Sequence, residues 1–364
     1  MHKKVDRPFL VTVVTLVIFG FFIFTSASLG LLAREGARFS SIAFNQFFFG
    51  IFLGSLALLT TLNINYKWWR KYALYFFLFS LGMTLLVFVP GIGYEYGGAK
   101  RWLDLGLFSF QPAELLKLGF VVYFASWLSG VRTQLHKLQY GLVPFLLLLG
   151  VVGGTLLLQP DTGTFMIIFA TGLAMYFTAG ARWRDIFLLG SMSALGLVVL
   201  AYFRPYVKAR ILTFLDPSID PLGTSYQIQQ SLIAIGSGQI SGRGFGQSVQ
   251  KFNFLPEPVG DSIFAVAAEE FGFIGAFIII GLFLFLCFRG LKIAKKSPDY
   301  FGGLLVVGIV ILIVFQSFTN IGAMLGVLPL TGLPLLFISH GGTALLFALA
   351  EIGIILNISK YCRK

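Results

Sequence analysis

Apolar runs of membrane-spanning length constrain this chain more than any other feature of its sequence. A helix needs roughly 20 apolar residues to cross the hydrocarbon core of a bilayer. Ten stretches have or approach this length, at residues 9–32, 43–62, 72–89, 112–129, 141–158, 163–179, 185–203, 262–288, 302–322 and 340–358. Only 12% of the residues are charged, whereas a soluble protein carries about a quarter. The sequence therefore predicts an all-α polytopic membrane protein with about ten transmembrane helices.

Lysine and arginine are distributed unevenly between the two sides of the predicted membrane. Of the 27 basic residues, 17 fall on the side that holds both termini and nine on the other, while Lys117 lies inside a span. Because cytoplasmic loops carry the excess of these residues, we expect a multi-pass protein of the cytoplasmic membrane with both termini in the cytoplasm. The basic residues are scattered over short loops, so we expect no nucleic-acid partner.

Two longer segments lie on the predicted outer side, at about residues 91–111 and 204–260. The second separates the seventh and eighth spans. Loops of such length are usually functional or disordered, and apolar residues throughout this one argue against disorder. Within it, "YQIQQSLIAIGSG" predicts an amphipathic helix at the membrane surface.

Four carboxylates gather in "LPEPVGDSIFAVAAEE", residues 255–270. Asp261 is expected at the outer surface, in the first turn of the eighth span, where it could simply cap the helix. Glu269 and Glu270 are expected deeper and on different faces, and capping does not account for them. Buried acids are expensive in a membrane, so this group predicts a polar cavity that opens outwards.

Two other acids have structural and functional interpretations. Glu114 and Lys117 are three residues apart in the fourth span, within pairing distance on a helix. They form either a self-neutralising ion pair or part of a polar pocket. Asp161 in "QPDTG" caps the sixth span or belongs to the site.

Cations on the outer side complement these acids. Arginine and lysine near a membrane surface are natural ligands for phosphate and pyrophosphate groups, although exposed ones can also be solvated loop charges. The outer cations are Lys100, Arg101, Arg204, Lys208, Arg210, Arg243 and Lys251. An acid opposite several cations at the membrane surface suggests a lipid-linked phosphate as substrate. We find no Walker loop, dinucleotide fingerprint or His/Cys metal cluster, so ATP-driven chemistry is not expected.

Six blocks in order resemble the SEDS family (shape, elongation, division and sporulation proteins). They are "GAKRWLDLGLFSFQPAELLKL" (98–118), "QPDTGTFMIIF" (159–169), "RILTFLDPSIDPLGTSYQIQQSLIAIGSGQISGRGFGQS" (210–248), "FLPEPVGDSIFAVAAEEFGFIG" (254–275), "FQSFTNIGAMLGVLPLTGLPLLFISHGGTALL" (315–346) and "GIILNIS" (353–359). The blocks "GQSVQKFNFLPEP" and "LNIS" look more like the FtsW and SpoVE branch than RodA, and closest to FtsW.

The resemblance implies that residues 1–364 form a single SEDS-type transmembrane domain with peptidoglycan glycosyltransferase activity. Such an enzyme polymerises lipid II, an undecaprenyl-linked disaccharide pentapeptide, into β-1,4 glycan strands on the outer face and releases undecaprenyl pyrophosphate. The implied partners are a class B penicillin-binding protein, which is a transpeptidase, and other cell-division proteins. Alternatives are a lipid II flippase, a RodA-like elongation polymerase and a non-catalytic divisome scaffold.

The resemblance also implies site residues. Asp261 matches the family's essential aspartate, and we expect it to act as general base. Glu114 and Lys117 match a polar pair in the fourth helix that would support this base. Expected substrate-binding residues are Lys100, Arg101, Trp102, Gln111, Arg210, Arg243, Lys251 and Ser339. A divalent cation, Mg²⁺ or Mn²⁺, is a candidate cofactor with Asp261 as its candidate ligand, although no ligand cluster in the sequence indicates one.

The chain departs from the family pattern next to these residues. Val259 and Gly260 stand where His-Thr is common, which puts the orientation of Asp261 in question. His340 replaces a tyrosine in the late "ISYGG" block, and Leu336 stands where proline is usual.

Overall fold

A computed structural model describes residues 4–34, 40, 42–96, 99–104, 109–216, 223 and 225–362. Most of the chain is helical. The first half holds α1 (Arg7–Arg34), the π-helical η1 (Asn45–Leu53), α3 (Gly54–Asn63), α4 (Tyr66–Lys71), α5 (Ala73–Leu85), the short 3₁₀ helix η2 (Leu86–Phe88), α6 (Pro112–Gly130), α7 (Leu142–Leu158) and α8 (Thr162–Thr178). The second half holds α9 (Trp183–Phe203), α10 (Pro205–Leu215), α11 (Tyr226–Ser237), α12 (Gln250–Asn253), α13 (Ile263–Lys295), α14 (Tyr300–Met324) and α15 (Gly342–Ser359).

Each of the ten predicted spans coincides with one of these helices or with a joined pair of them. Six helical segments of the described residues are long and apolar enough to cross a membrane: α1, η1 with α3, α9, α13, α14 and α15. Three shorter apolar helices are α5 with η2, α7 and α8. The prediction of a polytopic helical membrane protein is confirmed, and α11 confirms the predicted helix within the long loop.

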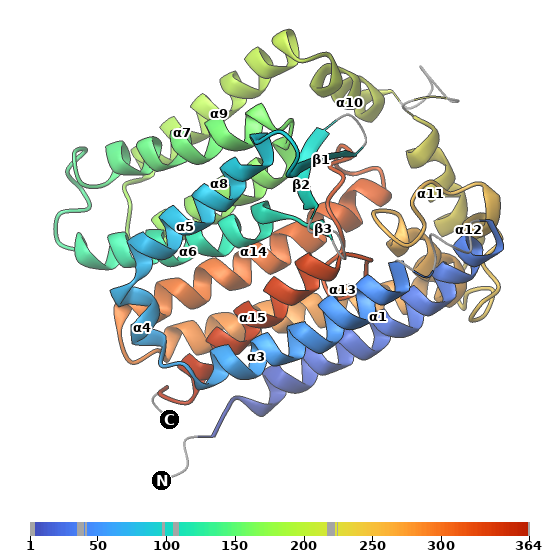
Figure 1. The fold of residues 1–364 in the computed structure, drawn as a ribbon, viewed down its shortest axis with the longest axis horizontal. Helices are drawn as coiled ribbons and strands as arrows, with labels where there is room; N and C mark the ends of the chain where they lie inside the picture. Colours follow the sequence, from blue (N-terminus) through green and yellow to red (C-terminus); the bar gives the residue numbers. More distant parts are fainter. Residues whose placement is uncertain are drawn as a thin grey trace.

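The core of the bundle lies at α14, α15 and α6. Of an 18-residue apolar stretch in each helix, 78% is buried inside the protein in α14 and 83% in α15, against 6% in α9. A helix that is apolar all round belongs in a core or in contact with lipid. Thus α14 and α15 are central, whereas α9 lies at the edge and faces hydrocarbon. In Figure 1 both termini lie at one end of the bundle, and the small sheet, α10, α11 and α12 lie at the other.

A small three-stranded antiparallel sheet, which was not predicted, lies within residues 91–111 of this otherwise helical protein. It consists of β1 (Gly93–Tyr96), β2 (Ala99–Asp104) and β3 (Ser109–Phe110) in the order β1-β2-β3. On β2, Trp102 pairs with Tyr94 while Lys100 pairs with Glu95. Arg101 is therefore an extra residue with no partner on β1, which is a β-bulge. Bulges commonly re-aim a side chain next to an active site.

α13 breaks at Gly272, inside the predicted eighth span. Gly272 has φ 65° and ψ −163°, a region essentially restricted to glycine. The break frees carbonyls of the preceding turn, and the long loop supplies their donors. The Arg243 and Gly244 backbone N–H groups donate to the Glu269 and Glu270 carbonyls, each at 3.0 Å.

The same loop also satisfies the amides after the break. Phe273 N–H donates to the Gln239 carbonyl at 2.9 Å, and Ile274 N–H donates to the Ile240 carbonyl at 3.2 Å. Close approach requires glycine here, because a Cβ on Gly242 would lie 2.1 Å from the Glu270 carbonyl oxygen. Irregular backbone is tolerated in a membrane segment only where protein buries and satisfies it. Residues 239–244 meet that requirement.

Candidate functional site

A tight turn presents Asp261 at the N-terminal end of α13, at the end of the bundle away from both termini. The Gly260 and Ser262 N–H groups both donate to the Glu257 carbonyl, at 3.0 and 3.2 Å. The N-cap residue of α13 is Ser262, so the capping interpretation of Asp261 is wrong. The Asp261 side chain is half-buried, and in the described part of the chain its carboxylate takes part in no hydrogen bond or ion pair.

Asn320 of α14 holds the backbone of this turn. Its Nδ2 donates to the carbonyl of Asp261 and to that of Leu333, both at 2.8 Å. One buried amide therefore joins the turn, α14 and the segment before α15. Sequence reasoning assigned Asn320 no role, although a polar residue within an apolar span is a recognised signal of a functional or bonded position.

Two further contacts fix the residues before Asp261. Ser339 Oγ donates to the Gly260 carbonyl at 2.9 Å and accepts from the Leu335 N–H at 2.8 Å. The His340 N–H donates to the Val259 carbonyl at 2.7 Å. The bonds from Ser339 and His340 reach the backbone of residues 259–260, so they do not need the His-Thr side chains of the family pattern. Ser339, expected to bind substrate, is buried and instead positions the turn.

Arg101 approaches the site from the sheet. Its Nε donates to the Gln159 carbonyl at 3.3 Å, and its Nη2 donates to the Pro160 carbonyl. These bonds tie the bulge of β2 to the start of α8. The next residue, Asp161, is the N-cap of α8, and its Oδ1 accepts from the Thr164 N–H at 3.2 Å. The capping interpretation of Asp161 is confirmed.

Arg210 approaches from α10 and lies beside Asp261. Its Nη1 donates to the Thr331 carbonyl at 3.2 Å. Asp261 Oδ2 and Arg210 Nη2 lie 3.6 and 3.7 Å from the point that a Cβ on Gly332 would occupy. Gly332 has φ +72°, so glycine permits this turn and leaves room for both groups. The structure therefore brings a predicted acid together with a predicted cation.

Burial and charge act in opposite directions on the Asp261 carboxyl. Burial is the largest effect and, with the negative charge of Glu257, raises its pKa from 3.8 to about 6. Arg210 and Arg101 oppose this rise. Arg210 also interacts electrostatically with Asp161, whose negative charge opposes the lowering of the guanidinium pKa by burial. Arg101, Arg210, Asp161, Glu257 and Asp261 thus form one electrostatic group, in which a carboxylate and its acid form are both accessible near neutral pH.

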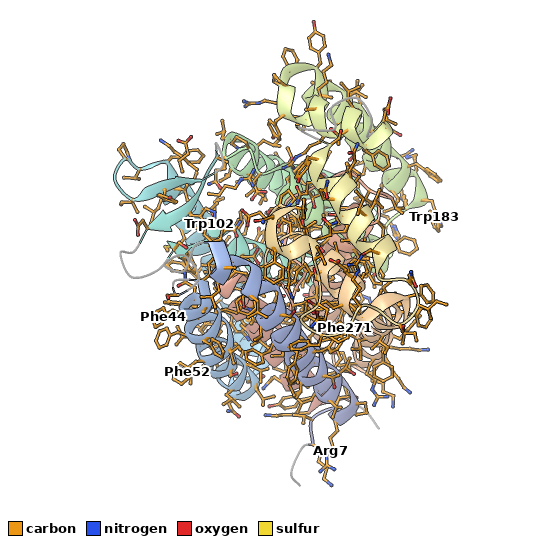
Figure 2. The ribbon with its side chains drawn as sticks, turned by 90° about the vertical axis from the view of Figure 1, so that its right-hand side faces the viewer. Arg7, Phe44, Phe52, Trp102, Trp183 and Phe271 are labelled. Atoms are coloured by element: carbon orange, nitrogen blue, oxygen red, sulfur yellow. The ribbon has the colours of Figure 1, made fainter. Side chains whose placement is uncertain are left out.

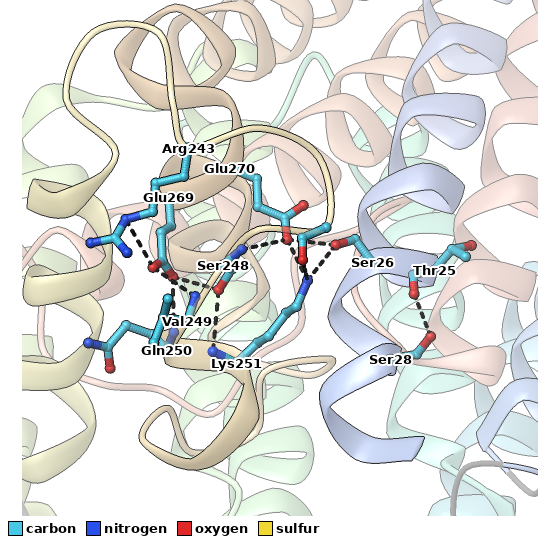
Figure 3. Close-up of polar contacts among 11 residues, drawn as sticks. Thr25, Ser26, Ser28, Arg243, Ser248, Val249, Gln250, Lys251, Glu269 and Glu270 are labelled. Carbon is cyan, nitrogen blue, oxygen red and sulfur yellow. Dashed lines mark hydrogen bonds and ion pairs between the residues drawn. The ribbon is translucent and has the colours of Figure 1, made fainter. Parts of the chain in front are cut away.

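Lys251 does not join this group. Its Nζ lies 2.7 Å from Glu270 Oε1, and both side chains are 0% exposed. Ser26 of α1 donates to the same carboxylate at 2.6 Å (Figure 3). The expectation that Lys251 binds substrate is therefore corrected. Its ammonium group is paired with a buried carboxylate, in a contact that joins the loop, α13 and α1.

Glu269, the preceding residue of α13, holds the same loop. It accepts from Ser248 Oγ at 2.5 Å and from the Val249 N–H at 3.1 Å. Arg243 Nε lies 3.6 Å from Glu269 Oε1, and the arginine side chain is 42% exposed (Figure 3). Glu269 and Glu270 were expected to line a cavity that opens outwards. They instead anchor residues 243–251 to the bundle.

Glu114 and Lys117 form the predicted ion pair, with Nζ and Oε2 2.8 Å apart and both side chains buried. Lys117 Nζ also donates to Gln316 Oε1 at 2.6 Å. Gln316 Nε2 donates to the Pro334 carbonyl at 3.2 Å, which links the pair to the segment that carries Gly332. Glu351 of α15 is a further buried acid whose electrostatic neighbours are Lys117 and Glu114. Sequence reasoning missed both Gln316 and Glu351.

The other expected substrate-binding residues lie on the sheet or beside it. Lys100 is exposed, Trp102 is half-buried, and Gln111 immediately precedes α6. Figure 2 shows Trp102 well away from the end of the molecule that carries Arg7. Within the described residues these three form no hydrogen bond or ion pair with Asp261. Their contact with a substrate stays a prediction.

Comparisons with known proteins agree along the whole chain. The FtsW/RodA/SpoVE family model, described as "Cell cycle protein", matches residues 7–364. Stage V sporulation protein E of Bacillus subtilis is 37% identical over 99% of this chain and 99% of that protein. The probable peptidoglycan glycosyltransferase FtsW of Idiomarina loihiensis is 40% identical over 97% of this chain and 86% of that protein.

Solved structures give the same result. One, described as "Structural coordination of polymerization and crosslinking by a peptidoglycan synthase complex", contains a chain with a TM-score of 0.79 and 29% identity, covering 99% of both chains. The rod shape determining protein RodA of Thermus thermophilus has a TM-score of 0.71 and 28% identity, over 99% of this chain and 98% of that one. This multi-pass membrane chain therefore belongs to the FtsW/RodA/SpoVE family of cell cycle proteins.

Proposed function

We propose that this protein is a peptidoglycan glycosyltransferase that polymerises lipid II into β-1,4 glycan strands. The observation that carries this proposal is the Asp261 carboxylate, half-buried at the outer end of α13 and faced by Arg210 and Arg101. A base beside two cations at a membrane surface suits a reaction that removes a hydroxyl proton and expels a pyrophosphate. Relatives named peptidoglycan glycosyltransferase FtsW support the assignment.

The chemistry assigns a role to each group. The sugar of lipid II is α-linked to pyrophosphate and the polymer is β-linked, so one in-line displacement inverts the anomeric carbon. Asp261 takes the proton of the acceptor 4-hydroxyl. At the same time the oxygen of that hydroxyl forms the new bond to the anomeric carbon. The bond to the pyrophosphate oxygen breaks, and undecaprenyl pyrophosphate leaves with the bonding electrons. Arg101 and Arg210 stabilise the charge that develops on the leaving group.

A divalent cation fits this site through Asp261. Mg²⁺ is usually held by one or two carboxylates together with substrate phosphates and water, and Asp261 supplies one such carboxylate. When bound, the ion would neutralise charge on the pyrophosphate. The described residues contain no group of three or more His, Cys, Asp or Glu arranged for a metal.

The proposal includes a topology and a partner. The excess of lysine and arginine at the end that holds both termini favours a cytoplasmic location for that end, which puts Asp261 on the outer face. The similarity to a chain of a peptidoglycan synthase complex supports a class B penicillin-binding protein as partner. Higher identity to FtsW and SpoVE than to RodA favours a role in division or sporulation over elongation.

The direct test uses purified protein in liposomes with labelled lipid II, Mg²⁺ or Mn²⁺, and the cognate transpeptidase. We expect a ladder of glycan polymer on a gel. Movement of labelled lipid II between leaflets without any polymer would instead identify a flippase. Absence of both activities with the partner present would leave a scaffold.

The pKa of Asp261 predicts the acid side of the pH profile. A general base works only when ionised, so kcat/KM should be constant well above pH 6 and fall about tenfold per pH unit below it. The midpoint should lie near pH 6, the raised pKa of this carboxyl. Initial rates of polymerisation between pH 4.5 and 8 measure this. A midpoint near pH 4, the ordinary value for aspartate, would contradict the role of burial.

Arg210→Gln should alter both the rate and this profile. Loss of one preorganised cation should lower kcat/KM by about 10²–10³-fold. Because Arg210 lowers the pKa of Asp261, its removal should also move the acid limb to higher pH. Arg210→Lys keeps the charge but not the planar fork, so it should lose rate while the limb stays in place. An unchanged limb in Arg210→Gln would show that the two groups are not coupled.

A further inference from the structure

A basic pocket lies at the opposite end of the molecule from Asp261. Its volume is about 310 Å³, and it is formed by residues before and at the start of α1, the last turns of α13 and the residues that end α15 and follow it. Its charged lining residues are Lys4, Asp6, Arg7, Arg289, Lys292 and Lys296. Five of these six are cations. The proposed glycosyltransferase activity uses none of them.

The single acid of the pocket is already neutralised. Asp6 Oδ1 and Oδ2 accept from Arg289 Nε and Nη2, both at 2.9 Å. Among the described residues no ion pair involves the other four cations. Their side chains are exposed at the rim. The pocket therefore has an excess of positive charge that no described acid balances.

The surroundings of the pocket match an amphiphile better than a free anion. Figure 2 shows Arg7 at the extremity of the bundle, where α1 emerges. About one turn into the membrane, the apolar side chains of Val11 on α1 and Phe288 on α13 are exposed, Phe288 to 70%. A headgroup in the pocket would have its acyl chains beside these residues. Basic pockets between membrane helices are a known mode of binding for anionic lipid heads.

We propose that this pocket binds the phosphodiester headgroup of an anionic membrane lipid. Lysine and arginine donate charge-assisted hydrogen bonds to phosphate oxygens, and the volume is at the lower end of the ~300–1,000 Å³ of small-molecule sites. The bound headgroup bridges the segment before α1, the end of α13 and the end of α15. It would therefore stabilise the packing of the three helices at this end.

Neighbouring lysines allow a matched test. Lys296, directly after α13, lines the pocket, whereas Lys295, the last residue of α13, is also exposed but does not line it. Full-length protein in neutral detergent is titrated with phosphatidylglycerol, and the thermal unfolding midpoint is followed. We expect a saturable rise for wild type and Lys295→Gln. For Lys292→Gln/Lys296→Gln, the apparent affinity should fall roughly tenfold or more, and Lys292→Arg should retain it.

Three comparison probes separate the sources of anionic charge. Phosphatidylcholine tests for a general lipid effect, glycerol phosphate for a soluble anion, and a polyglutamate peptide for an acidic protein segment. Stabilisation by phosphatidylglycerol alone supports the proposal. A loss for Lys295→Gln as large as that for Lys292→Gln/Lys296→Gln would overturn it in favour of diffuse surface attraction. Equal stabilisation by any of the three comparison probes would overturn it in favour of that ligand.

Discussion

Asp261→Asn is expected to abolish polymerisation of lipid II, with a loss of about 10²–10⁴-fold in rate, the contribution typical of a general base. The amide is nearly isosteric with the acid but cannot accept the proton. The turn should stay intact because its contacts use the backbone: Asn320 donates to the Asp261 carbonyl and Ser339 to the Gly260 carbonyl. Glycan polymer formed in liposomes measures the loss.

A matched acid-to-amide change provides the control. Glu95→Gln alters an exposed carboxylate on β1, at the same end of the molecule, and should keep wild-type rates. Both variants should insert into membranes and unfold at the wild-type temperature. Polymerisation by Asp261→Asn at a rate close to wild type would refute the assignment of the base while leaving the glycosyltransferase activity standing.

Lys251→Met is expected to destabilise the protein by about 3–5 kcal/mol, because it leaves Glu270 as an unpaired charge in a buried site. Lys251 and Glu270 are both 0% exposed, so water cannot replace the lost partner. Replacing both charges by apolar groups is often close to neutral. The double variant Lys251→Met/Glu270→Leu should therefore recover most of the lost stability. Thermal or denaturant unfolding in detergent measures these differences.

The exposed residue Lys208 of α10 serves as the control. Lys208→Met should change the free energy of unfolding by less than about 0.5 kcal/mol. The double variant also separates two roles of Lys251. Recovered stability with recovered activity fits a structural pair. Recovered stability without activity would restore Lys251 to the substrate site, against the geometry of the structure.

The features predictable from sequence are those that depend on local pattern. Apolar length located the spans, amphipathic spacing located α11, and a Pro-Asp pair located the cap of α8. Spacing of three residues also predicted the Glu114–Lys117 pair. The prediction that an acid and several cations lie together is confirmed for Asp261 with Arg101 and Arg210. Both arginines lie on segments that return to the same end of the bundle.

The features that sequence missed depend on which segments meet. Nothing local marks Lys251 as the partner of Glu270, 19 residues away and across a turn of the loop. In the sequence, Asn320 is one polar residue within an apolar span. Its role becomes clear only from the two carbonyl groups to which it donates in the structure. The bulge at Arg101 results from a shift in strand pairing that the residues of β2 alone do not predict.

The break in α13 at Gly272 has a consequence for how the protein is assembled in the membrane. Residues 273–295 after the break exceed the roughly 20 residues required to cross the hydrocarbon core, so this half can insert as an independent helix. Residues 263–271 cannot complete their backbone hydrogen bonds until residues 239–244 arrive beside them. The turn that carries Asp261 should therefore become ordered only when the long loop packs beside α13, so insertion of the helix alone does not complete the site.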